Sequence, residues 1–159
     1  MSAKTLNSIM LTGVTASLAK AMGIEPPQQA EASIGALDRL VEKNTKEGKV
    51  DRIFMYNPDA VAMWLYQKYT EYYLPLQDQI KLTLPLQCVM PSVTPVCFGT
   101  MYTGAMPEVH GIQAYEKPVI KIDTLFDALI RAGKKPAIVS TEDDSLSMIF
   151  LERPMDYYI

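Results

Sequence analysis

The sequence is poor in the residues that build metal clusters and disulfide frameworks. Its 159 residues include two cysteines, Cys88 and Cys97, and one histidine, His110. Two cysteines at this spacing form neither a disulfide framework nor a Cys-x-x-Cys site, so we interpret both as reduced thiols. Reduced thiols are typical of a cytoplasmic protein, and we expect this chain to be cytoplasmic.

Long apolar runs and an excess of basic residues are also missing. No run approaches the roughly 18 apolar residues of a membrane span, and the N-terminus has no apolar segment of the secretory type. We therefore expect no membrane partner. The chain has 15 basic and 18 acidic residues, a net charge of −3. This balance excludes a general nucleic-acid binder.

The hydrophobic content of 48% is enough to bury a core, and the pattern changes near residue 50. Residues 1–49 have helical periodicity over 12–22 and 30–44 and form an N-terminal helical segment. Residues 50–159 alternate between two kinds of element. Strands are expected at 52–56, 81–89, 136–140 and 148–151, and helices at 60–74, 96–103 and 124–132. This alternation predicts an α/β fold with a mostly parallel sheet and helices on both of its faces.

Two of the expected helices have further features. The helix at 60–74 is apolar on nearly all sides in its first two turns, which predicts burial. The helix that follows Thr124 begins with a capping box, in which the Thr124 hydroxyl and the Asp127 carboxylate bind opposing backbone donors. Gly133 is expected to end that helix.

Asp59 and Thr94 stand where chemistry is expected, because open α/β sheets bind ligands at the carboxyl ends of their strands. Asp59 follows the expected strand at 52–56, and Thr94 precedes the helix at 96–103. The commoner role of either residue is to cap the following helix. Pro95 suits the first helical position after a capping Thr94.

A capping Thr94 is compatible with an anion site. The N–H groups of Val96 and Cys97 would be free beside the Thr94 hydroxyl, where the helix dipole attracts negative charge. A threonine hydroxyl is a poor nucleophile unless a metal ion lowers its pKa, and a carboxylate such as Asp59 is a natural second ligand. The residues therefore point weakly to metal-assisted phosphoryl chemistry.

A resemblance strengthens this hypothesis. Residues 91–95 read Pro-Ser-Val-Thr-Pro, and residues 103–112 read Thr-Gly-Ala-Met-Pro-Glu-Val-His-Gly-Ile. With their spacing, they resemble the nucleophile segment of the alkaline phosphatase superfamily, most closely its type I phosphodiesterase and nucleotide pyrophosphatase branch. The resemblance extends over residues 50–141. It implies that residues 50–159 are the N-terminal part of an alkaline phosphatase-like α/β domain, incomplete in this chain.

The resemblance implies a phosphorylated nucleophile at Thr94, which would also ligate a metal, with Asp59 as a ligand of the same ion. The family uses two divalent ions, zinc in most members and manganese in its mutase branches. The backbone N–H groups of Val96 and Cys97 would bind substrate, a small phosphate ester or a nucleotide. Cys97 and Tyr115 stand near positions where this branch has asparagine, which leaves the substrate preference open.

The remaining polar candidates have structural interpretations. His110 belongs to the family's Pro-Glu-x-His-Gly turn, which is not a zinc ligand set, so we expect it to hold a tight turn. Cys97 has no basic neighbour in the sequence that would activate its thiol. Asp143 and Asp144 are expected in a solvated turn.

The family's two-metal site needs further Asp and His ligands, and a chain with one histidine cannot supply them. We therefore expect an N-terminal fragment of a larger enzyme that is inactive alone and either binds a missing C-terminal half or self-associates. Three functions remain open: a phosphate-ester hydrolase acting through phosphothreonine, a phosphomutase of the same superfamily, and a non-catalytic α/β binding module.

Overall fold

Helices dominate the residues that the structure describes. The computed structural model of the chain describes residues 9–158. In chain order the elements are α1 (Gly13–Met22), α2 (Gly35–Asn44), α3 (Met63–Lys68), the 3-10 helix η1 (Thr70–Tyr72), α4 (Leu74–Gln77), α5 (Thr94–Thr103), α6 (Pro107–His110), α7 (Leu125–Arg131), β1 (Ala137–Val139), α8 (Ser145–Ile149) and β2 (Asp156–Tyr158). None of these helices is long and apolar enough to cross a membrane.

The sheet of the described residues is small. Strands β1 and β2 pair in parallel, with Ala137 opposite Asp156 and Val139 opposite Tyr158, and α8 lies between them in the chain. The expected strand at 136–140 is thus confirmed as β1. The chain is α/β, but a mostly parallel sheet with helices on both faces is not confirmed.

The other expected strands fail for identifiable reasons. Residues 52–56 form no ladder with any described segment, and residues 81–89 form only an isolated bridge, from Gln87 to Met10. Residues 148–151 lie partly in α8, because Asp144 caps that helix by accepting a hydrogen bond from the Leu146 N–H (3.2 Å).

The prediction of a single buried helix at 60–74 is wrong. It is divided into α3, η1 and the start of α4, and no side chain of these three helices is buried. Ala60 has a φ of 56°, a left-handed conformation that a helix does not continue through. No described element covers the apolar side chains that suggested burial. Trp64, for example, is 62% exposed.

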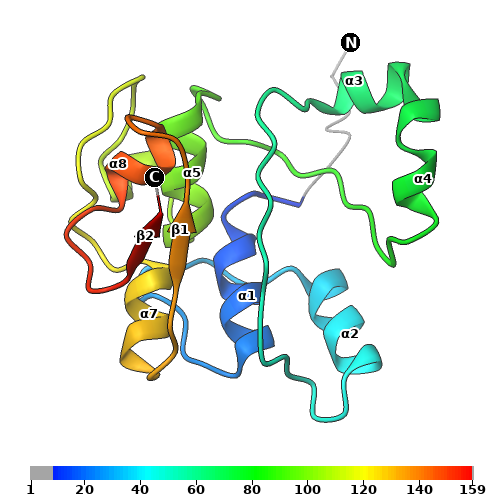
Figure 1. Cartoon of the computed structure of the whole chain (residues 1–159), viewed down its shortest axis with the longest axis horizontal. Coiled ribbons are helices and arrows are strands. Elements are labelled where there is room, and N and C mark those ends of the chain that lie inside the picture. The colour runs from blue at the N-terminus through cyan, green and yellow to red at the C-terminus, as the bar shows by residue number, and fades with distance from the viewer. Residues whose placement is uncertain (1–8, 159) are drawn as a thin grey trace.

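The core lies around α5, which packs against α1, α6, α7 and α8 (Figure 1). Its centre is an aromatic trio from three elements. Tyr102 stacks on Phe126 with ring centroids 5.0 Å apart, and Phe150 meets both rings edge-on at 5.3 and 5.0 Å. Such pairs add to the hydrophobic stabilisation of the buried rings. Leu18 and Ala19 of α1 belong to the same core, so residues of the N-terminal segment help to support α5.

Local signals at several helix ends are confirmed. Helix α1 ends at Gly23, whose φ of 67° satisfies the left-handed C-cap. Helix α7 begins with the expected capping box of Thr124 and Asp127, and its chain turns at Gly133 (φ 69°). Helix α2 is shorter than expected, because the Ile34 N–H is bound by the Ser17 hydroxyl (2.8 Å) before the helix begins.

Buried Asp38 joins α2 to α1. Its carboxylate accepts hydrogen bonds from Ser17 (3.0 Å), Ser33 (2.6 Å) and Lys20 (3.1 Å). Burial acts to raise the pKa of Asp38, but these hydrogen bonds and the Lys20 charge outweigh it, so the net shift is downward. The charged carboxylate is therefore the form that holds the two helices together.

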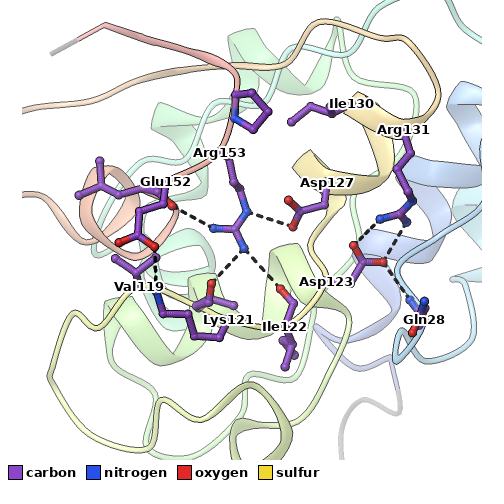
Figure 2. Close-up of a pocket in the computed structure, with 13 residues that line it drawn as sticks. Gln28, Val119, Lys121, Ile122, Asp123, Asp127, Ile130, Arg131, Glu152 and Arg153 are labelled. Atoms are coloured by element: carbon purple, nitrogen blue, oxygen red, sulfur yellow. Dashed lines mark hydrogen bonds and ion pairs between the residues drawn. The ribbon is translucent and has the colours of Figure 1, made fainter.

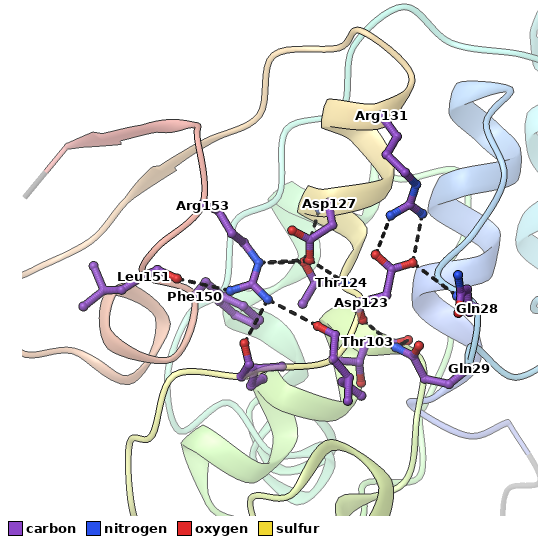
Figure 3. Close-up of polar contacts among 12 residues, drawn as sticks. Gln28, Gln29, Thr103, Asp123, Thr124, Asp127, Arg131, Phe150, Leu151 and Arg153 are labelled. Atoms are coloured by element: carbon purple, nitrogen blue, oxygen red, sulfur yellow. Dashed lines mark hydrogen bonds and ion pairs between the residues drawn. The ribbon is translucent and has the colours of Figure 1, made fainter.

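Arg153 forms the most connected polar contact of the fold (Figure 3). Its Nε donates to Asp127 (3.0 Å) and to the Thr124 hydroxyl (3.2 Å). Its terminal nitrogens donate to three carbonyl oxygens, those of Leu151 (3.3 Å), Ile120 (3.1 Å) and Ile122 (3.3 Å). The side chain is only 8% exposed. Arg153 thereby links the start of α7, residues 120–122 and the chain after α8.

We predict that Arg153→Met lowers the free energy of unfolding by about 3 kcal/mol, because it removes the cation paired with Asp127 and the donor of three carbonyls. The matched control is Arg131→Met. Arg131 also pairs with an aspartate, Asp123 (2.5 Å), but is half exposed, so its removal is expected to cost less than about 1 kcal/mol. Urea denaturation measures both losses, and equal losses would contradict the assignment.

Candidate functional site

Thr94 is the first residue of α5. Val93 is the N-cap, with extended backbone angles (φ −109°, ψ 155°), and Pro95 lies at the start of the helix. The expected capping role of Thr94 therefore belongs to Val93, which caps without a side-chain hydrogen bond. Thr94 is half-buried, and its hydroxyl forms no hydrogen bond with residues 9–158. The hydroxyl is thus available to a ligand at the helix N-terminus.

Val96 and Cys97 differ in the availability of their N–H groups. The Cys97 N–H donates to the Val93 carbonyl (3.0 Å), which is the first hydrogen bond of α5. The sequence predicts that the Cys97 N–H is free to bind phosphate, and this prediction is wrong because the N–H is already bound. The Val96 N–H has no partner among the described residues, and the Val96 side chain is fully buried.

Asp59 lies in an exposed turn before α3. Its carboxylate accepts a hydrogen bond from the adjacent Ala60 N–H (2.8 Å) and lies outside the helix that begins at Met63. The expected capping of a helix at Ala60 is therefore absent. No hydrogen bond joins Asp59 to Thr94, and the structure places the two on separate elements.

His110 holds the turn after α5. Its Nδ1 accepts a hydrogen bond from the Ile112 N–H (3.2 Å), so its Nε2 carries the proton and donates to the Thr100 hydroxyl (3.1 Å). The ring also lies against Gly99, where an added Cβ would be 2.7 Å from the imidazole. Glycine at this position therefore allows α6 to fold back onto α5.

Cys97 and Cys88 are neighbours in the structure. Burial, and secondly the Cys88 thiol, raise the pKa of Cys97 to about 11. The thiolate is the nucleophilic form of cysteine, so Cys97 is a protonated, unreactive thiol near neutral pH. This agrees with the absence of an activating neighbour in the sequence.

A charged groove of about 550 Å³ lies on another side of the core (Figure 2). Arg131 faces Asp123, Lys121 pairs with Glu152 (2.8 Å), and Arg153 pairs with Asp127. Each of these charges is neutralised within the groove, and neither Asp59 nor Thr94 lines it. The groove is therefore separate from the candidate site.

The residues of the candidate site do not complete a zinc site. Asp59 and Thr94 offer one carboxylate and one hydroxyl, whereas zinc takes about four ligands. Within residues 9–158 no group of three or more His, Cys, Asp or Glu side chains is placed to hold a metal. A metal bound at Asp59 and Thr94 would need further ligands from outside this set.

No protein-family model matches the sequence, and no curated protein or solved structure matches it significantly.

One hydrogen bond near the candidate site was not predicted from the sequence. The Asn57 amide donates to the buried Tyr102 hydroxyl (2.9 Å), which attaches the segment before Asp59 to α5. Asn57 precedes Pro58, a pair typical of turns, and no local pattern in the sequence points to this long-range contact.

We predict that iodoacetamide alkylates Cys88 at least about tenfold faster than Cys97 at pH 8, because only about one Cys97 in a thousand is a thiolate three units below its pKa. Peptide mass spectrometry over time measures both rates. In urea the two rates should converge, and faster alkylation of Cys97 in the folded protein would contradict the prediction.

Burial lowers the pKa of His110, although the Glu108 charge and nearby carbonyls oppose this shift. The unfolded chain therefore binds a proton on this residue more readily than the folded chain. The stability due to neutral His110 is complete above the ordinary pKa of about 6.5 and is lost as the pH falls through the lower folded value.

We therefore predict that the free energy of unfolding falls from pH 7 to pH 5, and that His110→Gln makes this fall smaller. Urea denaturation at each pH gives the two slopes. Comparing slopes rather than absolute stabilities corrects for any general loss in the variant. An unchanged slope in His110→Gln would mean that other groups cause the pH dependence.

Proposed function

We propose that this chain is the nucleophile-bearing part of a metal-dependent phosphate-ester hydrolase, of the phosphodiesterase and nucleotide pyrophosphatase type. The observation that carries the proposal is the composite motif at residues 91–95 and 103–112. In the structure this motif spans one continuous unit, from the Thr94 end of α5, through the left-handed Gly104 (φ 72°), to His110 folded back on Thr100. The unit offers a hydroxyl that has no hydrogen-bond partner within residues 9–158, at the start of a ten-residue helix.

The chemistry proposed for Thr94 is a double displacement. The Thr94 oxygen attacks phosphorus, the bond from phosphorus to the leaving alcohol breaks, and the alcohol leaves with the hydroxyl proton. Water then attacks the phosphothreonine and restores the hydroxyl. The Val96 N–H and the positive end of the α5 dipole would favour the anionic group at this place.

Metal ions would lower the pKa of the Thr94 hydroxyl. Asp59 and Thr94 alone do not satisfy zinc or manganese, so no step through a metal follows from these residues. We infer that other ligands must join them before turnover, and we expect little activity from this chain alone. A phosphomutase would need the same additional metal ligands and is a further candidate. It differs from a hydrolase in the molecule that accepts the phosphoryl group, a sugar hydroxyl instead of water.

A non-catalytic binding module is the second candidate. It is favoured by Asp59, whose carboxylate already has a local partner in the Ala60 N–H. In such a module zinc would leave the melting temperature unchanged. In the assembled hydrolase, with its further ligands present, zinc would raise the melting temperature of the wild type, and Asp59→Asn would reduce that rise.

We predict that Thr94→Ala lowers kcat on phosphate esters at least about 1,000-fold in the assembled enzyme, because it removes the attacking oxygen. Thr94→Ser keeps a hydroxyl and should retain part of the activity. Thr141→Ala, at an exposed threonine, is the matched control and should be unchanged. Metal content is measured for each variant, and full activity of Thr94→Ala with normal metal content would contradict the proposal.

A further inference from the structure

Residues 51–57 form an extended stretch without a backbone partner. The stretch runs nearly straight between α2 and α3 (Figure 1), and its N–H and C=O groups make no backbone hydrogen bond with residues 9–158. Its limits are clear, since the Val50 N–H is bound by the Ala21 carbonyl (2.8 Å) and Pro58 has no N–H. Seven consecutive residues are therefore free to pair as a strand, the property that makes an exposed edge a docking site.

The side chains of this stretch alternate. Met55 and Asn57 are half-buried against the molecule, and Asn57 is fixed by its hydrogen bond to Tyr102 (2.9 Å). Phe54 is 90% exposed and Tyr56 is 78% exposed, and Arg52 is also exposed. One face of the stretch thus meets the core, and the other presents two aromatic rings and a cation to solvent.

This outward face is complementary to itself in the antiparallel direction. Pairing two copies about Phe54 places Phe54 opposite Phe54 and Arg52 opposite Tyr56 on the same face. Aromatic pairs and cation–π pairs both stabilise cross-strand neighbours. Lys49 then stands opposite Asp59, a pair of opposite charges just beyond the stretch.

The neighbouring register is worse. Centring the pair on Met55 instead places Phe54 opposite Tyr56, but it loses the Arg52–Tyr56 pair because Arg52 then faces Pro58, and it brings the like charges of Asp51 and Asp59 towards each other. A one-residue shift would set outward residues against inward ones. The pairing about Phe54 is two-fold symmetric, because the same residues of both copies form the contact.

We propose that residues 51–57 dimerise this chain by antiparallel pairing with a second copy, centred on Phe54. The partner is the same segment of another molecule, and the interaction does not depend on the proposed hydrolase function. It combines the unpaired backbone with the outward Arg52, Phe54 and Tyr56 side chains.

Disulfide trapping tests the register. The background is Cys88→Ser with Cys97→Ser, and Phe54→Cys is added to it. At the two-fold axis opposing Cα atoms lie about 5 Å apart, within the range of a disulfide. Mild oxidation should convert most of this variant to a covalent dimer. Phe54 is highly exposed, so its replacement should not impair folding, and circular dichroism checks this.

The matched control is Tyr56→Cys in the same background. Tyr56 is about as exposed, but its two copies would lie about 14 Å apart along the strands, which no disulfide spans. It should not cross-link alone, whereas Tyr56→Cys combined with Arg52→Cys should. Equal cross-linking of the two single variants would mean non-specific association and would overturn the register.

Analytical ultracentrifugation of the wild type tests the dimer itself. At 100 µM the expected mass is twice the 17.8 kDa of one chain, and Met55→Pro, which removes a backbone donor from the stretch, should shift the mass towards one chain. A wild-type monomer at this concentration would overturn the proposal. In that case residues 51–57 would pair with a strand from a different polypeptide or from a further part of the protein.

Discussion

The guanidinium of Arg153 supplies hydrogen-bond donors to backbone carbonyls in the core. In most α/β proteins the N–H groups of a larger sheet supply such donors. Residues 120–122 and the chain after α8 are irregular, yet their carbonyls lie in a mostly buried region and need donors. Arg153 satisfies three of these carbonyls and the carboxylate of the α7 capping box at once. Its guanidinium carbon also lies 5.9 Å from the Phe150 ring centroid, so the polar network borders directly on the aromatic core. Arg153 therefore supports, together with the aromatic core, the positions of α7 and of the chain between α8 and β2 around α5.

No comparable network supports residues 51–80. Their helices bury no side chain, and aromatic rings such as Trp64 and Tyr72 face solvent. Stability is consequently uneven along the chain, high around α5 and low in this stretch. The Asn57–Tyr102 hydrogen bond is a connection between the two regions that relies on a single polar pair. A region of this composition gains stability mainly by burying its apolar surface against another polypeptide surface.

The sequence predicted those features whose cause is local. The capping box of Thr124 and Asp127 and the left-handed Gly23 each depend on residues within a few positions, and each is present. Strand β1 was also predicted, although it pairs with β2 further along the chain. Features that require a distant partner were predicted poorly. Residues 52–56 have the composition of a strand, but no described strand pairs with them, and the apolar pattern at 60–74 suggested a burial that no described element provides. The role of Arg153 has no local sequence signal, because its partners Asp127, Ile120 and Ile122 lie far away in the chain. For the candidate site, the sequence located the start of α5 to within two residues but not the bond that occupies the Cys97 N–H.

The two candidate ligands differ in how firmly the fold holds them. Thr94 begins a helix that packs against four other helices, and His110 contacts Gly99 and Thr100 within that helix. Asp59 follows the unpaired stretch by two residues and is held only through its own turn. A partner strand along residues 51–57 would reduce the freedom of Asp59, because a paired backbone fixes the direction in which the chain leaves the strand. Assembly and metal binding would then be thermodynamically linked, since ordering the stretch first would lower the entropic cost of bringing Asp59 to an ion. Thr94, the proposed nucleophile, is held in place by the chain itself, whereas the position of Asp59 depends on what binds beside it.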